Sequence, residues 1–223
     1  MEKHKVKILS IEKVTHDTLR ITTERPEDYN FTPGQATEIA INKNEWQDEW
    51  RPFTFTCLPE AENLEFTIKT YPSHDGATDK LLDLEPGDEL LLSEVFGAIT
   101  YKGKGVFIAG GAGVTPFIAI LRDLQRNNKL EGNMLLFANK TAKDIILKEE
   151  FEEMLGENFV NILSEEKSMD YAQGIIDAVF INKHVPDMDR YFYICGPEPM
   201  IDAVEKELIE LGVSKDQIVK EDL

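Results

Sequence analysis

The sequence predicts two domains, an antiparallel β-barrel followed by an α/β domain with a doubly wound parallel sheet. Short segments that alternate apolar and polar residues, separated by turns containing Pro and Gly, fill the first half of the chain. Segments typical of strands and helices alternate in the second half. Because the pattern changes near residues 96–101, we expect domains over residues 1–98 and 99–223.

The first domain is expected to consist mainly of strands. Alternation at period two and turn residues between the segments predict strands over residues 5–14, 18–23, 37–41, 53–58, 64–70 and 89–93. One helix is expected over residues 79–84. Many short strands at this spacing favour a barrel or a sandwich.

The second domain is expected to contain a parallel sheet with crossover helices. Strands are predicted over residues 105–109, 134–138, 159–163 and 191–195. An apolar face formed by Phe117, Ile120, Leu121 and Leu124 predicts the first helix. Further helices are predicted over residues 145–155, 175–181 and 197–211.

The composition restricts the function and the location of the chain. Its formal net charge of −18 is spread along both halves, and an acidic surface repels phosphate backbones, so no nucleic-acid partner is expected. No apolar run reaches the roughly 18 residues that span a bilayer, so no membrane partner is expected. The two separated cysteines and the lack of a visible secretory signal predict a cytoplasmic protein.

The histidines show no spacing typical of metal ligands, and we expect no metal site. We interpret all of them as surface or loop residues: His4, His16, His74 and His184. The loop Trp46–Trp50 is interpreted as an ordinary loop with one tryptophan packed on the barrel, the alternatives being a lid or a partner-docking element.

A glycine-rich turn follows the first predicted strand of the second domain and precedes a helix. It contains Gly110, Gly111, Ala112, Gly113, Val114, Thr115 and Pro116. Glycines allow a tight turn and a close approach of the backbone to a pyrophosphate, and the helix N-terminus favours an anion. The spacing differs from GxGxxG because the last glycine is replaced by Pro116, so a turn without a ligand remains the alternative.

A second loop with the same chemistry follows the last predicted strand. It contains Cys195, Gly196, Pro197 and, within the next helix, Met200. Carboxyl ends of strands are where open parallel sheets bind ligands, so we expect this loop and the glycine-rich turn to line one crevice. The alternative for Cys195 alone is a small buried thiol at the end of a strand.

In the first domain, Arg51, Pro52, Phe53 and Thr54 open a predicted strand. An arginine can pair with a phosphate, an aromatic ring can stack on a flat ring, and a threonine hydroxyl can hydrogen-bond a ring nitrogen. Alone, the segment could equally be an ordinary strand with a surface arginine.

Taken in order along the chain, these segments resemble the ferredoxin–NADP reductase family of flavoproteins, in its compact form. The resemblance covers nearly the whole chain and implies a flavin-binding barrel followed by a nucleotide-binding α/β domain. It implies that Arg51 holds the flavin phosphate, that Phe53 packs against the isoalloxazine and that Thr54 reaches its N5 atom. Ile68, Lys69 and Thr70 would border the ribityl and phosphate region, and Gly76, Ala77 and Thr78 would bind the pyrophosphate of FAD.

The resemblance also implies an enzyme. It would take hydride from NADH or NADPH and pass electrons singly to a redox carrier protein, with free flavin as another possible acceptor. Thr115 and Cys195 would flank the nicotinamide, and Thr54, Cys195 and Glu221 are the candidate catalytic residues. The cofactor is expected to be FAD, with FMN the less favoured alternative.

The choice of nicotinamide is predicted from charge. Ser164, Glu165 and Glu166 follow the third strand of the second domain, where carboxylates would repel a 2′-phosphate and could accept hydrogen bonds from a ribose diol. The segment Gly174–Ile176 has isoleucine where NADPH-specific members of the family often have arginine, whereas Lys140 after the second strand favours the phosphate. We therefore expect a slight preference for NADH.

Two other functions remain open. One is a non-catalytic subunit that binds flavin or nucleotide in a larger enzyme. The other is a nucleotide-binding module that uses only the turn at residues 110–116.

Overall fold

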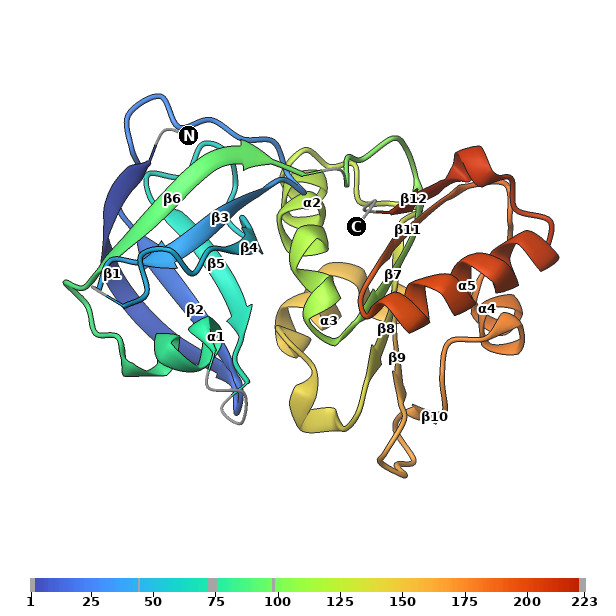
Figure 1. The fold of residues 1–223 in the computed structure, drawn as a ribbon. Coiled ribbons are helices and arrows are strands. Elements are labelled where there is room, and N and C mark those ends of the chain that lie inside the picture. The colour runs from blue at the N-terminus through green and yellow to red at the C-terminus, as the bar shows by residue number, and fades with distance from the viewer. Residues whose placement is uncertain (1–2, 44, 72–75, 98, 221–223) are drawn as a thin grey trace. The chain divides into compact units, whose positions relative to one another are not determined.

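A computed structural model describes residues 3–43, 45–71, 76–97 and 99–220 of the chain. The chain packs into two compact units, shown in Figure 1. Unit 1 comprises Met1–Ala98 together with Thr115–Asp123, and unit 2 comprises Ile99–Val114 and Leu124–Leu223. The division into a flavin-binding domain over residues 1–98 and a nucleotide-binding domain over residues 99–223 stays a prediction. Residue 98 lies outside the described part of the chain.

Unit 1 is built on an antiparallel sheet with the strand order β4-β3-β6-β1-β2-β5. Its strands are β1 (His4–Thr15), β2 (Thr18–Thr23), β3 (Ala36–Ile41), β4 (Arg51–Thr54), β5 (Leu64–Lys69) and β6 (Glu89–Phe96). A bridge between Phe55 and Phe66 links the two ends of this order, so the sheet curls into a barrel, as predicted. A short helix α1 (Ala77–Lys80) continues into a 3-10 turn, η1 (Leu81–Asp83).

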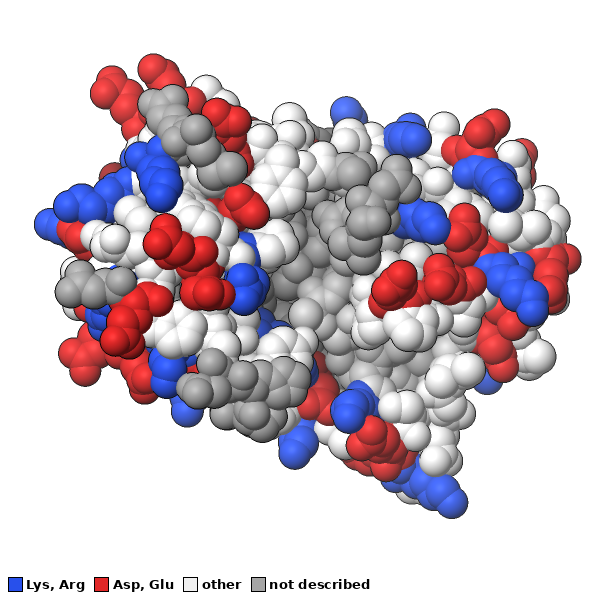
Figure 2. All heavy atoms as spheres, viewed as in Figure 1, with Lys and Arg blue, Asp and Glu red and all other residues white. Residues whose placement is uncertain are grey.

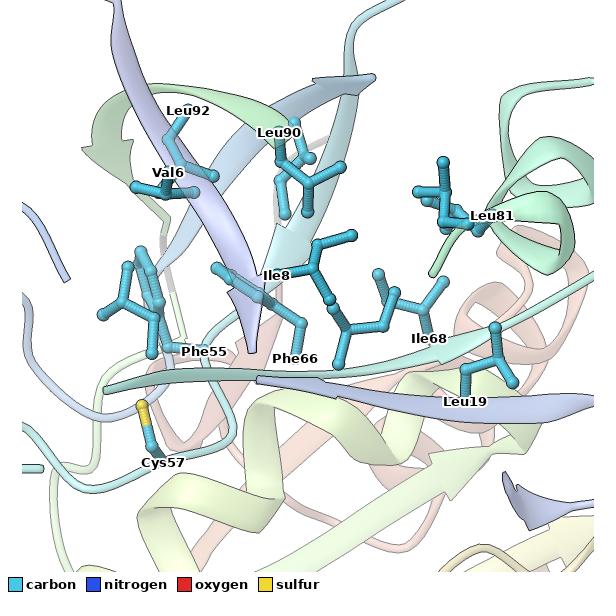
Figure 3. Close-up of a cluster of buried hydrophobic side chains, with 14 of the residues drawn as sticks. Val6, Ile8, Leu19, Phe55, Cys57, Phe66, Ile68, Leu81, Leu90 and Leu92 are labelled. Carbon is cyan, nitrogen blue, oxygen red and sulfur yellow. The ribbon is translucent and has the colours of Figure 1, made fainter. Parts of the chain in front are cut away.

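The alternation of the sequence explains the barrel core. In β2, Leu19 and Ile21 face inwards and are 4% and 0% exposed, while the alternate residues are more accessible or polar. Aromatic rings fill the centre, and Phe31 stacks on Phe55 at a centroid separation of 4.2 Å. Figure 3 shows the side chains of several strands converging on this core. Removal of one such ring typically costs about 3–5 kcal/mol.

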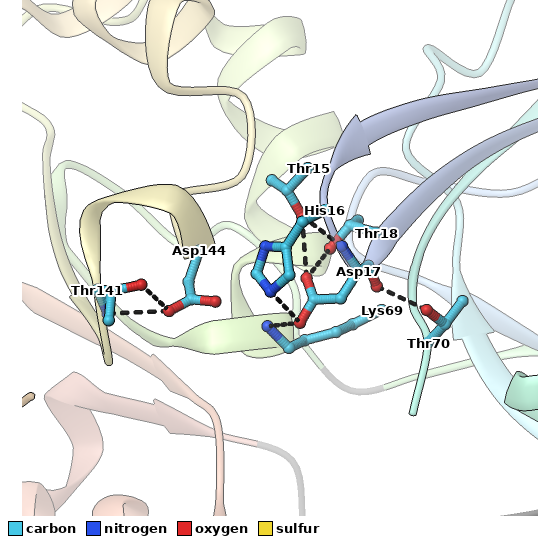
Figure 4. A network of polar contacts seen from close by, with 8 residues as sticks. All are labelled: Thr15, His16, Asp17, Thr18, Lys69, Thr70, Thr141 and Asp144. Carbon is cyan, nitrogen blue, oxygen red and sulfur yellow. Dashed lines mark hydrogen bonds and ion pairs between the residues drawn. The ribbon is translucent and has the colours of Figure 1, made fainter. Parts of the chain in front are cut away.

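The turn between β1 and β2 is fixed by Asp17. Its carboxylate accepts a hydrogen bond from Thr15 at 2.9 Å and pairs with Lys69 Nζ at 2.8 Å, while its carbonyl oxygen accepts from Thr70 Oγ1 at 2.9 Å (Figure 4). Burial alone would raise the pKa of Asp17, but the hydrogen bonds from Lys69 and Thr15 outweigh it and the pKa lies below its ordinary value. Residues 17, 69 and 70 therefore tie β5 to the β1–β2 turn.

Unit 2 is built on a parallel sheet with the strand order β10-β9-β8-β7-β11-β12. Its strands are β7 (Gly105–Gly110), β8 (Met134–Asn139), β9 (Phe159–Leu163), β10 (Ala172–Gln173), β11 (Tyr191–Cys195) and β12 (Ile218–Lys220). The chain runs from β7 to β10 in one direction across the sheet and then returns to place β11 on the other side of β7. This reversal between β7 and β11 is the topological switch point of an open α/β sheet.

Helices cover both faces of this sheet, which confirms the predicted α/β architecture. Helices α4 (Ala178–His184) and α5 (Glu198–Glu210) bury Phe180, Ile181 and Val204 in a core shared with the sheet. On the other face, α3 (Lys148–Leu155) places Phe151 5.4 Å from the ring of Phe159, and Figure 1 shows α3 and α5 on opposite sides of the sheet. Helix α2 (Thr115–Arg126) connects β7 to β8.

Several predicted boundaries were wrong for local reasons. The helix predicted over residues 145–155 begins only at Lys148, because Thr141 and Asp144 form a capping box around a 3-10 turn, η3 (Ala142–Asp144), and Leu147 is left-handed with φ of 52°. The helix predicted from residue 175 begins at Ala178, since the Asp177 carboxylate caps the amide of Phe180 at 2.8 Å. Strand β4 ends at Thr54 rather than at residue 58.

Among the described residues, none of the helices has the length and apolar character that crossing a bilayer requires.

Candidate functional site

Two loops meet at the switch point of the unit 2 sheet. Strand β7 ends at Gly110 and β11 ends at Cys195, and the two strands are hydrogen-bonded neighbours with Cys195 opposite Ala109. The 3-10 turn η2 (Gly111–Val114) follows β7, and Gly196–Pro197 follows β11. Both loops therefore leave the same carboxyl edge of the sheet, where ligands bind in open α/β folds.

Glycine is required where these loops touch. A β-carbon at Gly113 would lie 2.3 Å from the carbonyl oxygen of Cys195, and one at Gly196 would lie 3.1 Å from the backbone nitrogen of Gly110. At Gly111, by contrast, φ is +52° and a β-carbon would meet nothing within 4 Å. The glycines thus bring two backbones into contact, and the open space at Gly111 leaves room for a group bound at the turn.

The chemistry of this edge suits an anion. Helix α2 begins at Thr115 directly after the turn, with Pro116 in its first turn, and α5 begins at Glu198 directly after Pro197. Amides at the start of a helix and the helix dipole favour negative charge. The edge therefore has the backbone features expected of a pyrophosphate site.

Tyr193 anchors β11 beneath this edge. Its hydroxyl accepts hydrogen bonds from the amides of Lys102 and Gly103 at 2.9 and 3.0 Å and donates to the Gly103 carbonyl at 2.7 Å. Its ring stacks on Phe107 of β7 at 4.6 Å, and burial raises the pKa of its hydroxyl. Sequence analysis did not assign this role, because only the fold brings residues 102–103 to the side chain of Tyr193.

In unit 1, the segment Arg51–Thr54 forms β4, the terminal strand in the sheet order. Its pairing with β3 places Phe53 opposite Thr37 and Thr54 opposite Ala36. Arg51 is about half exposed and forms an ion pair with Glu49 at 3.0 Å, while Phe53 is half-buried against the barrel core. A terminal strand has backbone groups that the sheet does not use, and together with the Arg51 guanidinium they could bind a polar, phosphate-bearing ring system.

The other predicted flavin residues lie at β5 and α1. Ile68 is 2% exposed and its side chain belongs to the barrel core, so only its backbone is available to a ligand. Lys69 and Thr70 make the contacts with Asp17 described above. Gly76 is the N-cap of α1, Ala77 is buried and Thr78 is half-buried.

At the carboxyl ends of β8 and β9, acidic and basic side chains pair. Lys140 Nζ lies 3.1 Å from Glu165, and the Glu166 carboxylate accepts a hydrogen bond from the Ala142 amide at 2.9 Å. Beside them, Thr141 and Asp144 form the capping box, with their side chains 2.6 Å apart (Figure 4). The carboxylate of Glu165 thus offsets the charge of the only cation that favoured a 2′-phosphate in the prediction.

The buried amide of Asn139, at the end of β8, was also missed from the sequence. It is 7% exposed, and neither its oxygen nor its nitrogen has a hydrogen-bond partner in the described part of the chain. Buried amides are normally satisfied by protein, water or ligand. Its place after an apolar strand is the signal that could have identified it.

The remaining assignments divide into three groups. Glu221 and His74 lie outside the described residues. Half-buried His4 lies in β1, and half-buried His184 ends α4 with its ring 4.6 Å from Phe180; burial lowers the pKa of His184. Trp46 packs against the barrel core, as the plainer interpretation of its loop expected.

Comparison with known proteins matches both parts of the chain. A family model described as an FAD-binding domain matches residues 3–84, and one described as an oxidoreductase NAD-binding domain matches residues 107–206. Together with the barrel and the α/β sheet in this order, these matches show an FAD-binding domain followed by an oxidoreductase NAD-binding domain. This is the arrangement that the resemblance to ferredoxin–NADP reductases predicted.

Curated relatives that match nearly the whole chain are named as reductases. The reductase component of propane 2-monooxygenase from Mycolicibacterium goodii is 30% identical over 96% of the chain, which covers 66% of that protein, slightly less than two thirds. NADH-cytochrome b5 reductase 2 from Mycosarcoma maydis is 24% identical over 94% of the chain, which covers 70% of that protein.

The two-domain fold is also found in solved structures. A ferredoxin NADP+ reductase from Neisseria gonorrhoeae, with bound FAD and NADP, has a TM-score of 0.87 and 20% identity, covering 99% of this chain and 98% of that one. At this identity the likeness concerns the fold alone.

Proposed function

We propose that this protein is an NAD(P)H-dependent flavoprotein reductase that passes electrons singly to a redox carrier protein. The observation that supports this most directly is the contact between the Gly111–Val114 turn and the Cys195 loop at the switch point of a sheet matched by an NAD-binding family model. The FAD-binding model over the barrel supplies the second half of the proposal. The relatives named above are reductases by their names.

Bound FAD would supply the chemistry that couples a two-electron donor to a one-electron acceptor. The chain's own residues would bind and orient the reactants. Arg51 would hold a phosphate and Thr54 would present its hydroxyl to the flavin ring, while the glycines at 111 and 113 would let the nucleotide approach the backbone. Cys195 would pack beside the nicotinamide, and none of these residues needs to act as a strong acid or base.

We further propose NADH as the preferred donor. Glu165 and Glu166 place carboxylates at the end of β9, and the pairing of Glu165 with Lys140 reduces the cationic character of the neighbouring loop. A 2′-phosphate at this edge would meet net negative charge, whereas a ribose diol could donate hydrogen bonds to the carboxylates. A relative named an NADH-cytochrome b5 reductase agrees with this preference.

The acceptor is proposed as a redox carrier protein, because the relatives' names describe a monooxygenase reductase component and a cytochrome b5 reductase. Free flavin as an acceptor, a cytoplasmic location, and the alternative of a non-catalytic subunit of a larger enzyme remain predictions. The non-catalytic alternative would bind cofactor without reducing it.

The test is anaerobic reduction of the flavin-loaded protein. Purified protein should be yellow, and NADH should bleach its absorbance faster than NADPH does at equal concentrations. Arg51→Ala should reduce flavin content several-fold, because it removes the proposed phosphate ligand. Arg20→Ala is the matched control, since Arg20 lies on β2 and pairs only with the surface carboxylate of Glu12 in the contacts described.

Three results would contradict the proposal. Protein that takes up no flavin on reconstitution would exclude a flavoprotein. Flavin that binds but is not bleached by either nicotinamide would favour the non-catalytic alternative. Full flavin content in Arg51→Ala would remove the proposed role of Arg51.

A further inference from the structure

Arg122 of helix α2 holds a mostly buried position against the barrel strands. Its Nη1 atom donates to the backbone oxygen of Thr56 at 2.6 Å and to Oε1 of Glu65 at 2.7 Å. The side chains of Arg122 and Glu65 are 17% and 19% exposed. All three residues belong to unit 1, because Thr115–Asp123 packs with the barrel.

The partners of Arg122 are themselves fixed. Glu65 Oε1 also accepts a hydrogen bond from Thr56 Oγ1 at 2.8 Å, and Thr67 donates to the same Thr56 hydroxyl at 3.2 Å. Both Thr56 and Thr67 are buried. Such a network has a defined geometry, and removing one charged partner leaves the other buried and uncompensated.

The contact of Arg122 lies on the helix that directly follows the glycine-rich turn. Helix α2 starts at Thr115, immediately after the turn Gly111–Val114 that belongs to unit 2. Thr56 lies two residues beyond Thr54, at the end of the proposed flavin strand. Arg122 therefore ties the helix that follows the proposed nicotinamide turn to β5 and to the segment just beyond β4, the strand with the proposed flavin ligands.

We propose that Arg122 is a positioning residue for hydride transfer. By holding α2 on the barrel through Glu65 and Thr56, it restrains the helix that directly follows the proposed nicotinamide turn. This inference rests on the proposed function, but the anchoring of the helix can be measured without it. Because hydride transfer needs reacting atoms held at contact distance, small displacements reduce the rate steeply.

The test compares Arg122→Met with Arg126→Met. Arg126 lies one turn further along the same helix and is exposed, so the control removes the same charge from α2 without touching Glu65. Hydrogen–deuterium exchange on the flavin-free proteins reports the anchor. Stopped-flow reduction of the flavin-loaded proteins at saturating NADH reports positioning, with flavin content and thermal unfolding measured in parallel.

We expect Arg122→Met to speed amide exchange across residues 115–123 and to slow flavin reduction by roughly tenfold or more, with little change in KM. Arg126→Met should change neither. Arg122→Lys keeps the charge but not the geometry of the guanidinium, and should fall between Arg122→Met and the wild type.

Equal reduction rates in Arg122→Met and Arg126→Met would overturn the positioning role, and so would a loss confined to flavin content. Unchanged exchange over residues 115–123 would overturn the anchor itself. If Arg122→Met does not fold, Glu65→Gln takes its place, because it removes the carboxylate charge and keeps an acceptor for Arg122. If the wild-type protein is not reduced at all, the proposed function fails, and the exchange data alone decide whether Arg122 anchors the helix.

Discussion

Gly113 has its identity fixed by a neighbouring backbone rather than by an unusual torsion angle. Any β-carbon there would overlap the carbonyl oxygen of Cys195, which the register of β11 holds in place. Backbone atoms cannot rotate away as a long side chain would. The contact between the two loops therefore depends on one missing methyl group.

Gly113→Ala should separate the two loops. We expect a lower midpoint of thermal unfolding, from a loss of about 1–3 kcal/mol for the overpacking, and weaker binding of NADH. Gly156→Ala is the control for general destabilisation, because alanine at its φ of +53° strains the backbone, whereas the added β-carbon meets nothing within 4 Å. Differential scanning calorimetry and NADH titration measure the two effects, and equal NADH affinities in the two variants would show that the close approach is unimportant for binding.

At the residue scale, the sequence correctly predicted which loops lie at the same edge of the sheet. The glycines at 111 and 113 and the strand end at Cys195 were placed at one edge, because parallel strands end together. It missed Tyr193 and Arg122, whose partners lie far away in the sequence and are brought close only by the fold. No local pattern marks these two residues.

At the scale of elements, strands and their order in the chain were largely predictable, and element ends were not. The apolar runs at β7, β8 and β11 are short and uninterrupted, as in sheets buried on both faces, and Asn161 alone interrupts that of β9. By contrast, β10 and β12 escaped prediction because they are very short edge strands. The delayed start of α3 follows from the Thr141–Asp144 capping box, which diverts the backbone first.

The loop after β9 is the element in which nicotinamide choice should be changeable. Glu165→Arg removes a carboxylate, frees Lys140 from its ion pair and adds a cation. We expect the ratio of kcat/KM for NADPH to that for NADH to rise by roughly tenfold, about 1.4 kcal/mol of differential binding. Steady-state kinetics with both donors measure the change.

Glu157→Arg is the control for that substitution. Glu157 is exposed and precedes β9 at the amino end of the strand, so the same charge change is made away from the proposed nucleotide edge. A similar shift in both variants would indicate a long-range effect of net charge and would contradict a local role for Glu165.

At the scale of the whole molecule, the dominant property is its net charge of −18. In Figure 2, acidic side chains are spread over the visible face of both units rather than gathered in a single patch. Such a charge slows the approach of another acidic protein and accelerates the approach of a basic one.

The salt dependence of the electron-transfer rate should therefore show whether the acceptor carries net negative or net positive charge. With an acidic carrier such as ferredoxin, the second-order rate constant should rise as salt is added, because screening reduces repulsion. With basic cytochrome c it should fall. An uncharged quinone is the control and should show little change; a rate with ferredoxin that falls with salt would reveal a local basic docking surface that outweighs the net charge.

Because Thr115–Asp123 packs in unit 1, the two units cannot be exchanged between related proteins by a single cut in the sequence. The barrel unit is not one uninterrupted stretch of sequence, since part of it returns after the first strand of the other unit. A single crossover between two related genes, placed at residue 98, would combine a barrel with a foreign helix α2. Chimaeras are therefore expected to work best when the partner of Arg122 at position 65 is exchanged along with the helix.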